Sequence, residues 1–105
     1  MALRHAEPGQ PICLSTVGEG ANKIALVKSD EFEAILLKLS AGESLPSHQV
    51  NGSITLQCLS GSTDLEQDGV IRRLEERSWV FLEGGAAHSL RAVEDCELLL
   101  TIILR

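Results

Sequence analysis

The stretch from residue 53 to residue 74, SITLQCLSGSTDLEQDGVIRRL, carries the clearest structural signal in the chain. Two runs of strand-forming character, 63–67 and 70–74, are separated by only Asp68 and Gly69. An Asp-Gly pair tolerates the positive φ angles of a type I′ turn, whose twist matches that of antiparallel strands. The sequence therefore predicts a β-hairpin over these two runs.

The residues that precede this hairpin, 53–60, alternate between two faces as those of a β-strand do. Ile54, Leu56 and Cys58 fall on one face, and Gly61 ends the run. We therefore expect a strand that presents an apolar row to the protein core.

The rest of the chain repeats this pattern, because Gly, Pro, Asn or Asp interrupts it every eight to twelve residues. Short, evenly spaced strands are typical of an all-β sandwich or barrel. Segment 32–39 also contains good helix formers, so a helix is the alternative to a strand there, and the flanking Gly and Ser residues favour the strand. Further strands are expected at residues 23–28, 78–82, 88–93 and 98–104.

The chain length of 105 residues is that of one domain. Residues 1–11 contain Pro8, Gly9 and Pro11, which predict a flexible N-terminal arm. Residues 12–105 are then expected to form a single β-barrel domain.

Composition and charge exclude several classes of partner. Fifteen acidic residues against nine basic ones give a net charge of -6, and one Trp, two Phe and no Tyr leave few platforms for base stacking. We therefore expect no nucleic-acid binding. The apolar runs are too short to span a membrane, and residues 1–10 lack the apolar segment of a secretory signal. Three widely spaced cysteines without a CxxC pair predict reduced thiols and a cytoplasmic location.

The last strand, residues 98–104, is apolar on both of its faces. A strand of this kind is buried twice, against the core and against a helix, a second sheet or another subunit. Because a symmetric dimer is the commonest oligomer, we expect a homodimer.

Histidines are the residues best suited to carry chemistry in this chain, which has three of them. His5 falls in the expected arm. His48 follows a loop at 40–47, and His88 follows Gly84 and Gly85 at the start of a strand. Since two hairpins separate them, His48 and His88 can meet inside a barrel, and we expect them together at its mouth.

Residues 39–104, about two thirds of the chain, resemble the small stand-alone cupins. The first cupin motif runs Gly, five residues, His, one residue, His, three or four residues, Glu, six residues, Gly. The second runs Gly, five residues, Pro, one residue, Gly, two residues, His, three residues, Asn. The matching residues are Gly42, His48 and Gly61 in the first motif and Gly85 and His88 in the second. The resemblance implies a cupin-type double-stranded β-helix, or jelly-roll barrel.

Other positions of the two motifs depart from the family pattern. Val50 and Ile54 stand where the first motif has its second His and its Glu. The metal site of the family uses three His and one Glu, so the resemblance implies a site reduced to His48 and His88. Such a pair suits a divalent transition metal (Fe, Ni, Cu, Zn or Mn), whereas a stable site normally needs at least three protein ligands. In the second motif, Arg77, Glu83 and Ala92 replace the first Gly, the Pro and the Asn.

An apolar pocket with two polar groups suits a small aromatic or acyl compound that carries an anionic or hydroxyl group. Three functions stay open: binding of a small molecule in the barrel with a reduced (two-His) or lost metal site, a metal-dependent dioxygenase or isomerase that uses His48 and His88, and a structural or regulatory dimer. The residues expected to line the pocket are His48, Val50, Ile54, Leu56, Cys58, Trp79, Phe81 and His88.

Overall fold

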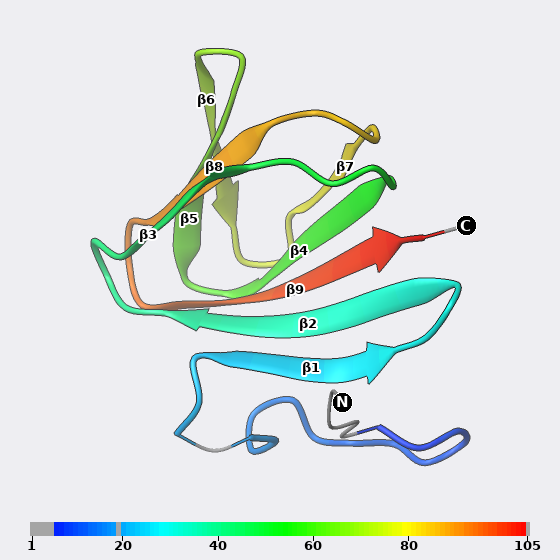
Figure 1. The fold of residues 1–105 in the computed structure, drawn as a ribbon. Coiled ribbons are helices and arrows are strands. Elements are labelled where there is room, and N and C mark those ends of the chain that lie inside the picture. Colours follow the sequence, from blue (N-terminus) through cyan, green and yellow to red (C-terminus); the bar gives the residue numbers. More distant parts are fainter. Residues whose placement is uncertain (1–5, 19, 105) are drawn as a thin grey trace.

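Two antiparallel β-sheets make up the computed structural model, which describes residues 6–18 and 20–104 (Figure 1). One sheet has five strands in the order β1-β2-β9-β4-β7, and the other has four in the order β3-β8-β5-β6. The strands in the described residues are β1 (Lys23–Lys28), β2 (Phe32–Leu39), β3 (Ser44–His48), β4 (Ile54–Ser60), β5 (Ser62–Gln67), β6 (Val70–Glu75), β7 (Trp79–Leu82), β8 (His88–Ala92) and β9 (Cys96–Ile103). This arrangement confirms the predicted all-β fold class.

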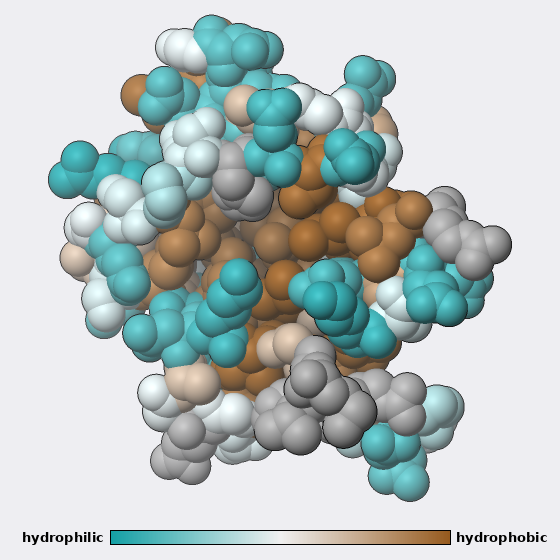
Figure 2. All heavy atoms as spheres, in the orientation of Figure 1, coloured by the Kyte–Doolittle hydropathy of each residue, from teal (hydrophilic) through white to brown (hydrophobic). Residues whose placement is uncertain are grey.

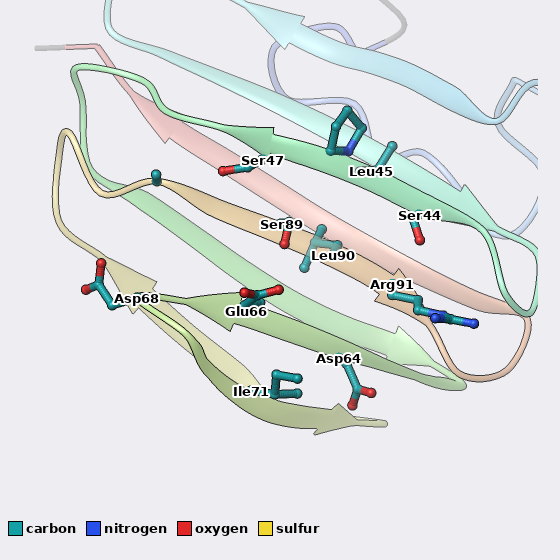
Figure 3. A pocket seen from close by; sticks show the side chains of 12 residues that line it. Ser44, Leu45, Ser47, Asp64, Glu66, Asp68, Ile71, Ser89, Leu90 and Arg91 are labelled. Carbon is teal, nitrogen blue, oxygen red and sulfur yellow. The ribbon is translucent and has the colours of Figure 1, made fainter.

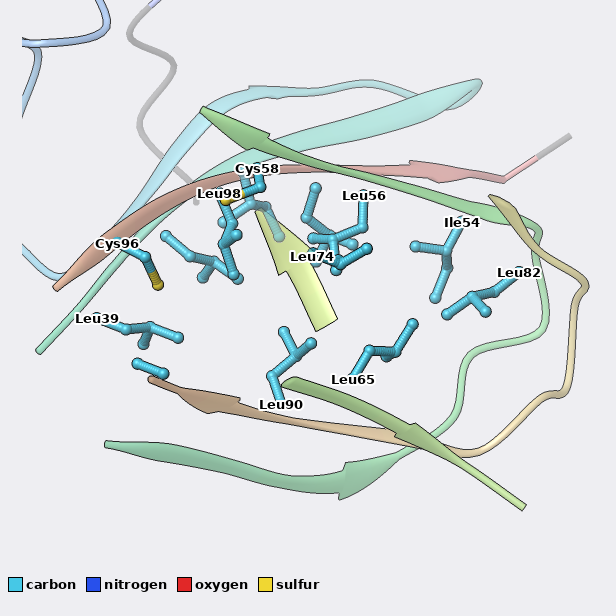
Figure 4. Close-up of a cluster of buried hydrophobic side chains, with 14 of the residues drawn as sticks. Leu39, Ile54, Leu56, Cys58, Leu65, Leu74, Leu82, Leu90, Cys96 and Leu98 are labelled. Atoms are coloured by element: carbon cyan, nitrogen blue, oxygen red, sulfur yellow. The ribbon is translucent and has the colours of Figure 1, made fainter. Parts of the chain in front are cut away.

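The core lies between the two sheets and is built from alternate residues of the strands. In β4, Ile54, Leu56 and Cys58 are buried, while the residues between them are only partly buried. Leu98 of β9 lies directly opposite Cys58 and is also buried. Figure 4 shows these side chains pointing into the space between the sheets. The alternation predicted for this strand is therefore confirmed.

The hairpin of β5 and β6 turns at Asp68 and Gly69, as the sequence predicts. Their φ angles are 53° and 77°, both positive as a type I′ turn requires. Gln67 pairs with Val70 across the turn. The hairpin projects beyond the rest of the barrel in Figure 1.

The β2 segment is a strand, and the helical alternative for these residues is wrong. β2 pairs with β1 along one side and with β9 along the other. Ile35 and Leu37 point into the main core, whereas Leu36 points to the opposite face and is nevertheless fully buried. The helix-like composition of β2 therefore reflects a strand that is buried on both faces.

Residues 12–17, here called the covering segment, account for this second burial. They form irregular turns that pack on the outer face of the five-stranded sheet, against a buried cluster of Ile24, Leu26 and Leu36. Leu99, on the second face of β9, packs against the same cluster. The packing side chains of the segment are Ile12, Leu14 and Val17.

Part of the predicted flexible arm lies outside the described residues, namely residues 1–5. Residues 6–11 are mostly exposed, and the Ala6 amide donates a hydrogen bond of 3.0 Å to the Leu26 carbonyl oxygen of β1. The described residues include no helix of the length and hydrophobicity that crossing a lipid bilayer requires.

Cys13 in the covering segment differs from the other two cysteines. Its exposed thiol lies 2.9 Å from the Ser15 hydroxyl, and this hydrogen bond is the main cause that lowers the pKa of Cys13 to about 7. Cys58 and Cys96 are buried, and their burial raises the pKa of both thiols, that of Cys96 to about 11.

We predict that iodoacetamide alkylates Cys13 alone in the folded protein, with a rate that is half-maximal near pH 7. The reason is that the thiolate is the nucleophile, and a lowered pKa makes it abundant at neutral pH. Mass spectrometry of the alkylated peptides across a pH series measures this rate. Ser15→Ala should move the midpoint to higher pH, and an unchanged midpoint in that variant would contradict the role given to the hydroxyl.

Candidate functional site

A cavity of about 300 Å³ lies between the two sheets. Nine of its thirteen lining residues are apolar, and the other four are polar or charged. In the view of Figure 2, hydrophobic side chains gather in the middle of the surface and hydrophilic ones surround them. The lining residues are Asn22, Lys23, Leu37, Leu39, Glu43, Leu45, Pro46, Ile54, Leu56, Leu82, His88, Leu90 and Leu100.

The mouth of the cavity lies between the start of β1 and strand β3. Asn22 and Lys23 on one side, and Glu43 and Pro46 on the other, line the cavity and are exposed to solvent. The remaining lining residues are buried or partly buried. A ligand would therefore enter past charged and amide groups and come to rest among leucine and isoleucine side chains.

His88 is the polar residue deep inside this cavity. It begins β8, its side chain is only 3% exposed, and its Nδ1 lies 3.3 Å from the Ala86 carbonyl oxygen. Because a carbonyl oxygen can only accept, this contact favours the tautomer that carries its proton on Nδ1. The ring orientation is thus fixed by the backbone of the loop that precedes β8.

His48 and His88 lie on neighbouring strands, in direct register. Their backbones pair across β3 and β8, beyond an irregularity in β3 that follows Leu45. The chain therefore brings the two histidine positions together although forty residues separate them.

Hydrogen bonds between two loops hold the start of β8 beside the end of β3. The Gly85 amide donates to the Val50 carbonyl oxygen over 2.7 Å, and the Gln49 side-chain amide donates to the Gly85 carbonyl oxygen over 3.3 Å. A Cβ atom on Gly84 would come within 2.2 Å of the Asn51 carbonyl oxygen. Only glycine permits so close an approach, so the Gly-Gly pair is what joins the two motif regions.

Three of the expected pocket residues line the cavity, namely Ile54, Leu56 and His88. Val50 is partly buried and packs against the main core near the loop contact described above. Cys58 lies on the same face of β4 but beyond the cavity, where its thiol is 3.4 Å from the Ser60 carbonyl oxygen.

Trp79 and Phe81 of β7 point away from the cavity, which corrects the expectation that they line the pocket. These side chains are 61% and 50% exposed, and they lie across from Gln57 and Thr55 on the outer face of the five-stranded sheet. The residue of β7 that reaches the cavity is Leu82. Sequence reasoning missed it because all four residues of this strand are apolar, and the alternation therefore gives no phase.

The donor set is incomplete for the metal site that the resemblance implies. Ile54, at the position of the motif glutamate, is 2% exposed and offers no donor atom. Among the described side chains, no group of three or more His, Cys, Asp or Glu is close enough to hold a metal ion. The residues present therefore do not fit the family's metal site with its four ligands.

A larger, open groove of about 740 Å³ lies on the outer face of the four-stranded sheet (Figure 3). Asp64 of β5 lies across from Arg73 of β6 and Arg91 of β8, and its carboxylate accepts a hydrogen bond of 2.9 Å from Arg73 Nε. A groove lined by cross-strand charge pairs and serine hydroxyls is a solvated sheet face. The residues that line the groove are Ser44, Leu45, Pro46, Ser47, Asp64, Glu66, Asp68, Ile71, Ala87, Ser89, Leu90 and Arg91.

Solved structures of cupins have the same fold as this chain. A cupin superfamily protein from Desulfitobacterium hafniense matches with a TM-score of 0.84 and 17% identity over 100% of both chains. A double-stranded β-helix protein from Klebsiella pneumoniae matches with a TM-score of 0.81 and 14% identity, over 90% of this chain and 89% of that one. An RmlC-like cupin from Desulfovibrio desulfuricans matches with a TM-score of 0.73 and 24% identity, over 78% and 80%.

No protein-family model matches the chain, and no curated protein does either. At these identities the structural matches establish the fold. The resemblance to cupins is therefore confirmed for the architecture, a cupin-type jelly-roll barrel.

We predict that Gly84→Ala destabilises the protein by about 2 kcal/mol, because the added methyl group would force the two loops apart. Urea unfolding followed by circular dichroism measures the change. Ala87→Ser, an exposed position in the same loop, serves as the matched control and should have little effect. Equal stability of Gly84→Ala and the wild type would show that the loops do not need this close contact.

Proposed function

We propose that this cupin-fold protein binds a small, largely apolar molecule in the cavity between its sheets. The observation that carries this function is the pairing of an apolar cavity of about 300 Å³ with one buried, oriented imidazole. Ligand sites are typically concave and mostly apolar, with a few fixed polar groups that orient the ligand. His88 is the buried polar group of this cavity, and its contact with the Ala86 carbonyl oxygen orients its ring.

The size of the cavity sets the class of ligand and the affinity range. Its volume is at the lower end of known ligand sites, which fits a compound of about ten non-hydrogen atoms. At roughly 0.5 kcal/mol per atom, such a compound binds with a free energy of about -5 kcal/mol and a Kd of about 0.2 mM. A search for the ligand must therefore use millimolar concentrations.

We predict that compounds of this class raise the melting temperature of the wild-type protein and not that of Leu90→Phe. The phenyl ring of this variant fills the cavity from β8 and leaves no room for a ligand. A thermal-shift screen measures the effect, and Ile71→Phe on the exposed strand β6 is the matched control. Stabilisation that survives in Leu90→Phe would place binding elsewhere on the protein.

The alternative function is that of a metal-dependent enzyme, such as a dioxygenase or isomerase, and it is favoured by the register of His48 with His88. Metal analysis by mass spectrometry separates the two functions, with the protein incubated in Fe, Ni, Cu, Zn or Mn salts. Ligand binding without a metal predicts no stoichiometric uptake at micromolar concentrations. Uptake that disappears in both His48→Ala and His88→Ala would support the enzyme instead.

We also propose that two copies of the chain associate through the outer face of the five-stranded sheet. The exposed side chains of Trp79 and Phe81 lie there, in rows that continue across β4 and β9 through Gln57, Thr55 and Thr101 without a charged residue. Aromatic residues are enriched and charged residues depleted at the centre of interfaces. A stable interface buries about 800 Å² on each partner, and a symmetric pairing of this face would bring the aromatic side chains of both copies into it.

We predict that the wild-type protein sediments as a dimer and that the double variant Trp79→Thr, Phe81→Thr sediments as a monomer. Threonine keeps the preference for a strand and removes the aromatic area. Since Trp79 is the single tryptophan, dilution of the wild type should also shift its fluorescence to longer wavelength. A wild-type monomer at high concentration would contradict this association.

A further inference from the structure

Lys23, the first residue of β1, has its side chain on the inner side of the barrel. In the register of β1 with β2, Lys23 lies directly opposite Leu37, which is buried in the main core and lines the cavity. Opposite residues of an antiparallel pair point to the same face of the sheet. Lys23 lines the cavity and is exposed to solvent, so it belongs to the mouth of the cavity.

The ammonium group of Lys23 is available to a ligand. Lys23 is exposed, and no carboxylate in residues 6–18 or 20–104 forms an ion pair with it. Asn22, beside it at the mouth, uses its backbone carbonyl to accept a hydrogen bond of 2.8 Å from the Lys38 amide. Asn22 is itself exposed and lines the cavity at the same mouth.

The acidic residue across the mouth is already engaged in its own turn. One carboxylate oxygen of Glu43 accepts a hydrogen bond of 3.0 Å from the Ser40 amide, and the Glu43 carbonyl oxygen accepts one of 2.8 Å from the Ala92 amide. These bonds give Glu43 a structural role in the connection between β2 and β3. Neither charged group at the mouth has an ion-pair partner among the described residues, but the Glu43 carboxylate already accepts a backbone hydrogen bond, whereas the Lys23 ammonium has no hydrogen-bond partner there.

We infer that Lys23 anchors the carboxylate of a small aliphatic or aromatic monocarboxylic acid whose apolar body occupies the cavity. The apolar wall beyond Lys23 accepts the body of the acid, and the ammonium and the Asn22 amide both donate to the carboxylate at the solvent boundary. This ligand class deepens the ligand-binding function proposed above and depends on it. A lysine that only blunts the edge of a sheet would have no such preference for carboxylates.

The test compares octanoate with its neutral and cationic analogues, octan-1-ol and octylamine, by calorimetric titration. The expected result is that Lys23→Met weakens octanoate binding about fivefold, as loss of one exposed charge-assisted contact should, and leaves octan-1-ol binding unchanged. Lys23→Arg, which keeps the charge, should retain most of the affinity. Lys28→Met, at the far end of the same strand and away from the cavity, is the matched control.

Each outcome of the titration has a distinct meaning. Wild-type protein that binds octan-1-ol or octylamine at least as tightly as octanoate overturns the carboxylate preference and leaves the cavity function standing. Equal octanoate affinity in Lys23→Met and the wild type overturns the anchor. If the wild-type protein binds none of the three probes, both the proposed function and the anchor are overturned.

Discussion

The molecule depends on apolar side chains packed between two sheets, and the cavity exists because this packing is incomplete. Cys58, Cys96 and Leu98 belong to the packed part of this core (Figure 4). Ile54 and Leu82 belong to the same core but line the cavity, whose mouth lies between β1 and β3. Structure and candidate site therefore share one set of strands, and the site is the part of the core that the chain leaves unfilled. The same packing explains why the walls are aliphatic and why polar groups gather at the mouth.

Local patterns in the sequence were sufficient to predict most of the fold. The Asp68-Gly69 pair specified its turn through positive φ angles, and the polar residues between Ile54, Leu56 and Cys58 gave the inward face of β4. The cupin resemblance supplied the jelly-roll architecture, which no local pattern contains. What local patterns could not provide was the cover on the outer face. The covering segment contributes scattered apolar residues without a period, so its packing on Leu36 emerges only in three dimensions.

The candidate site was less predictable, because strand register and position within the barrel decide which side chains line the cavity. Each residue of β7 is apolar, so Trp79 and Phe81 could not be assigned to a face by alternation. Cys58 had the correct face, but it packs in the core without lining the cavity. Lys23 reaches the site only through its pairing with Leu37, a residue fourteen positions later in the chain. The position of His88 beside His48, in contrast, followed from motif spacing that the two loops enforce.

The covering segment has no regular secondary structure, so it should open at a lower free energy than the barrel strands. The barrel strands are tied by ladders of backbone hydrogen bonds, whereas residues 12–17 are held to the sheet chiefly by side-chain packing. Segments with few protected amides detach at lower free energy than the unit they lie on. Fluctuations that detach this segment would expose Leu36 while the barrel stays folded. Amide hydrogen exchange in the native protein should accordingly be faster in residues 12–17 than in the barrel strands. The rate at which this segment opens then sets how often the apolar outer face of the sheet is exposed to solvent.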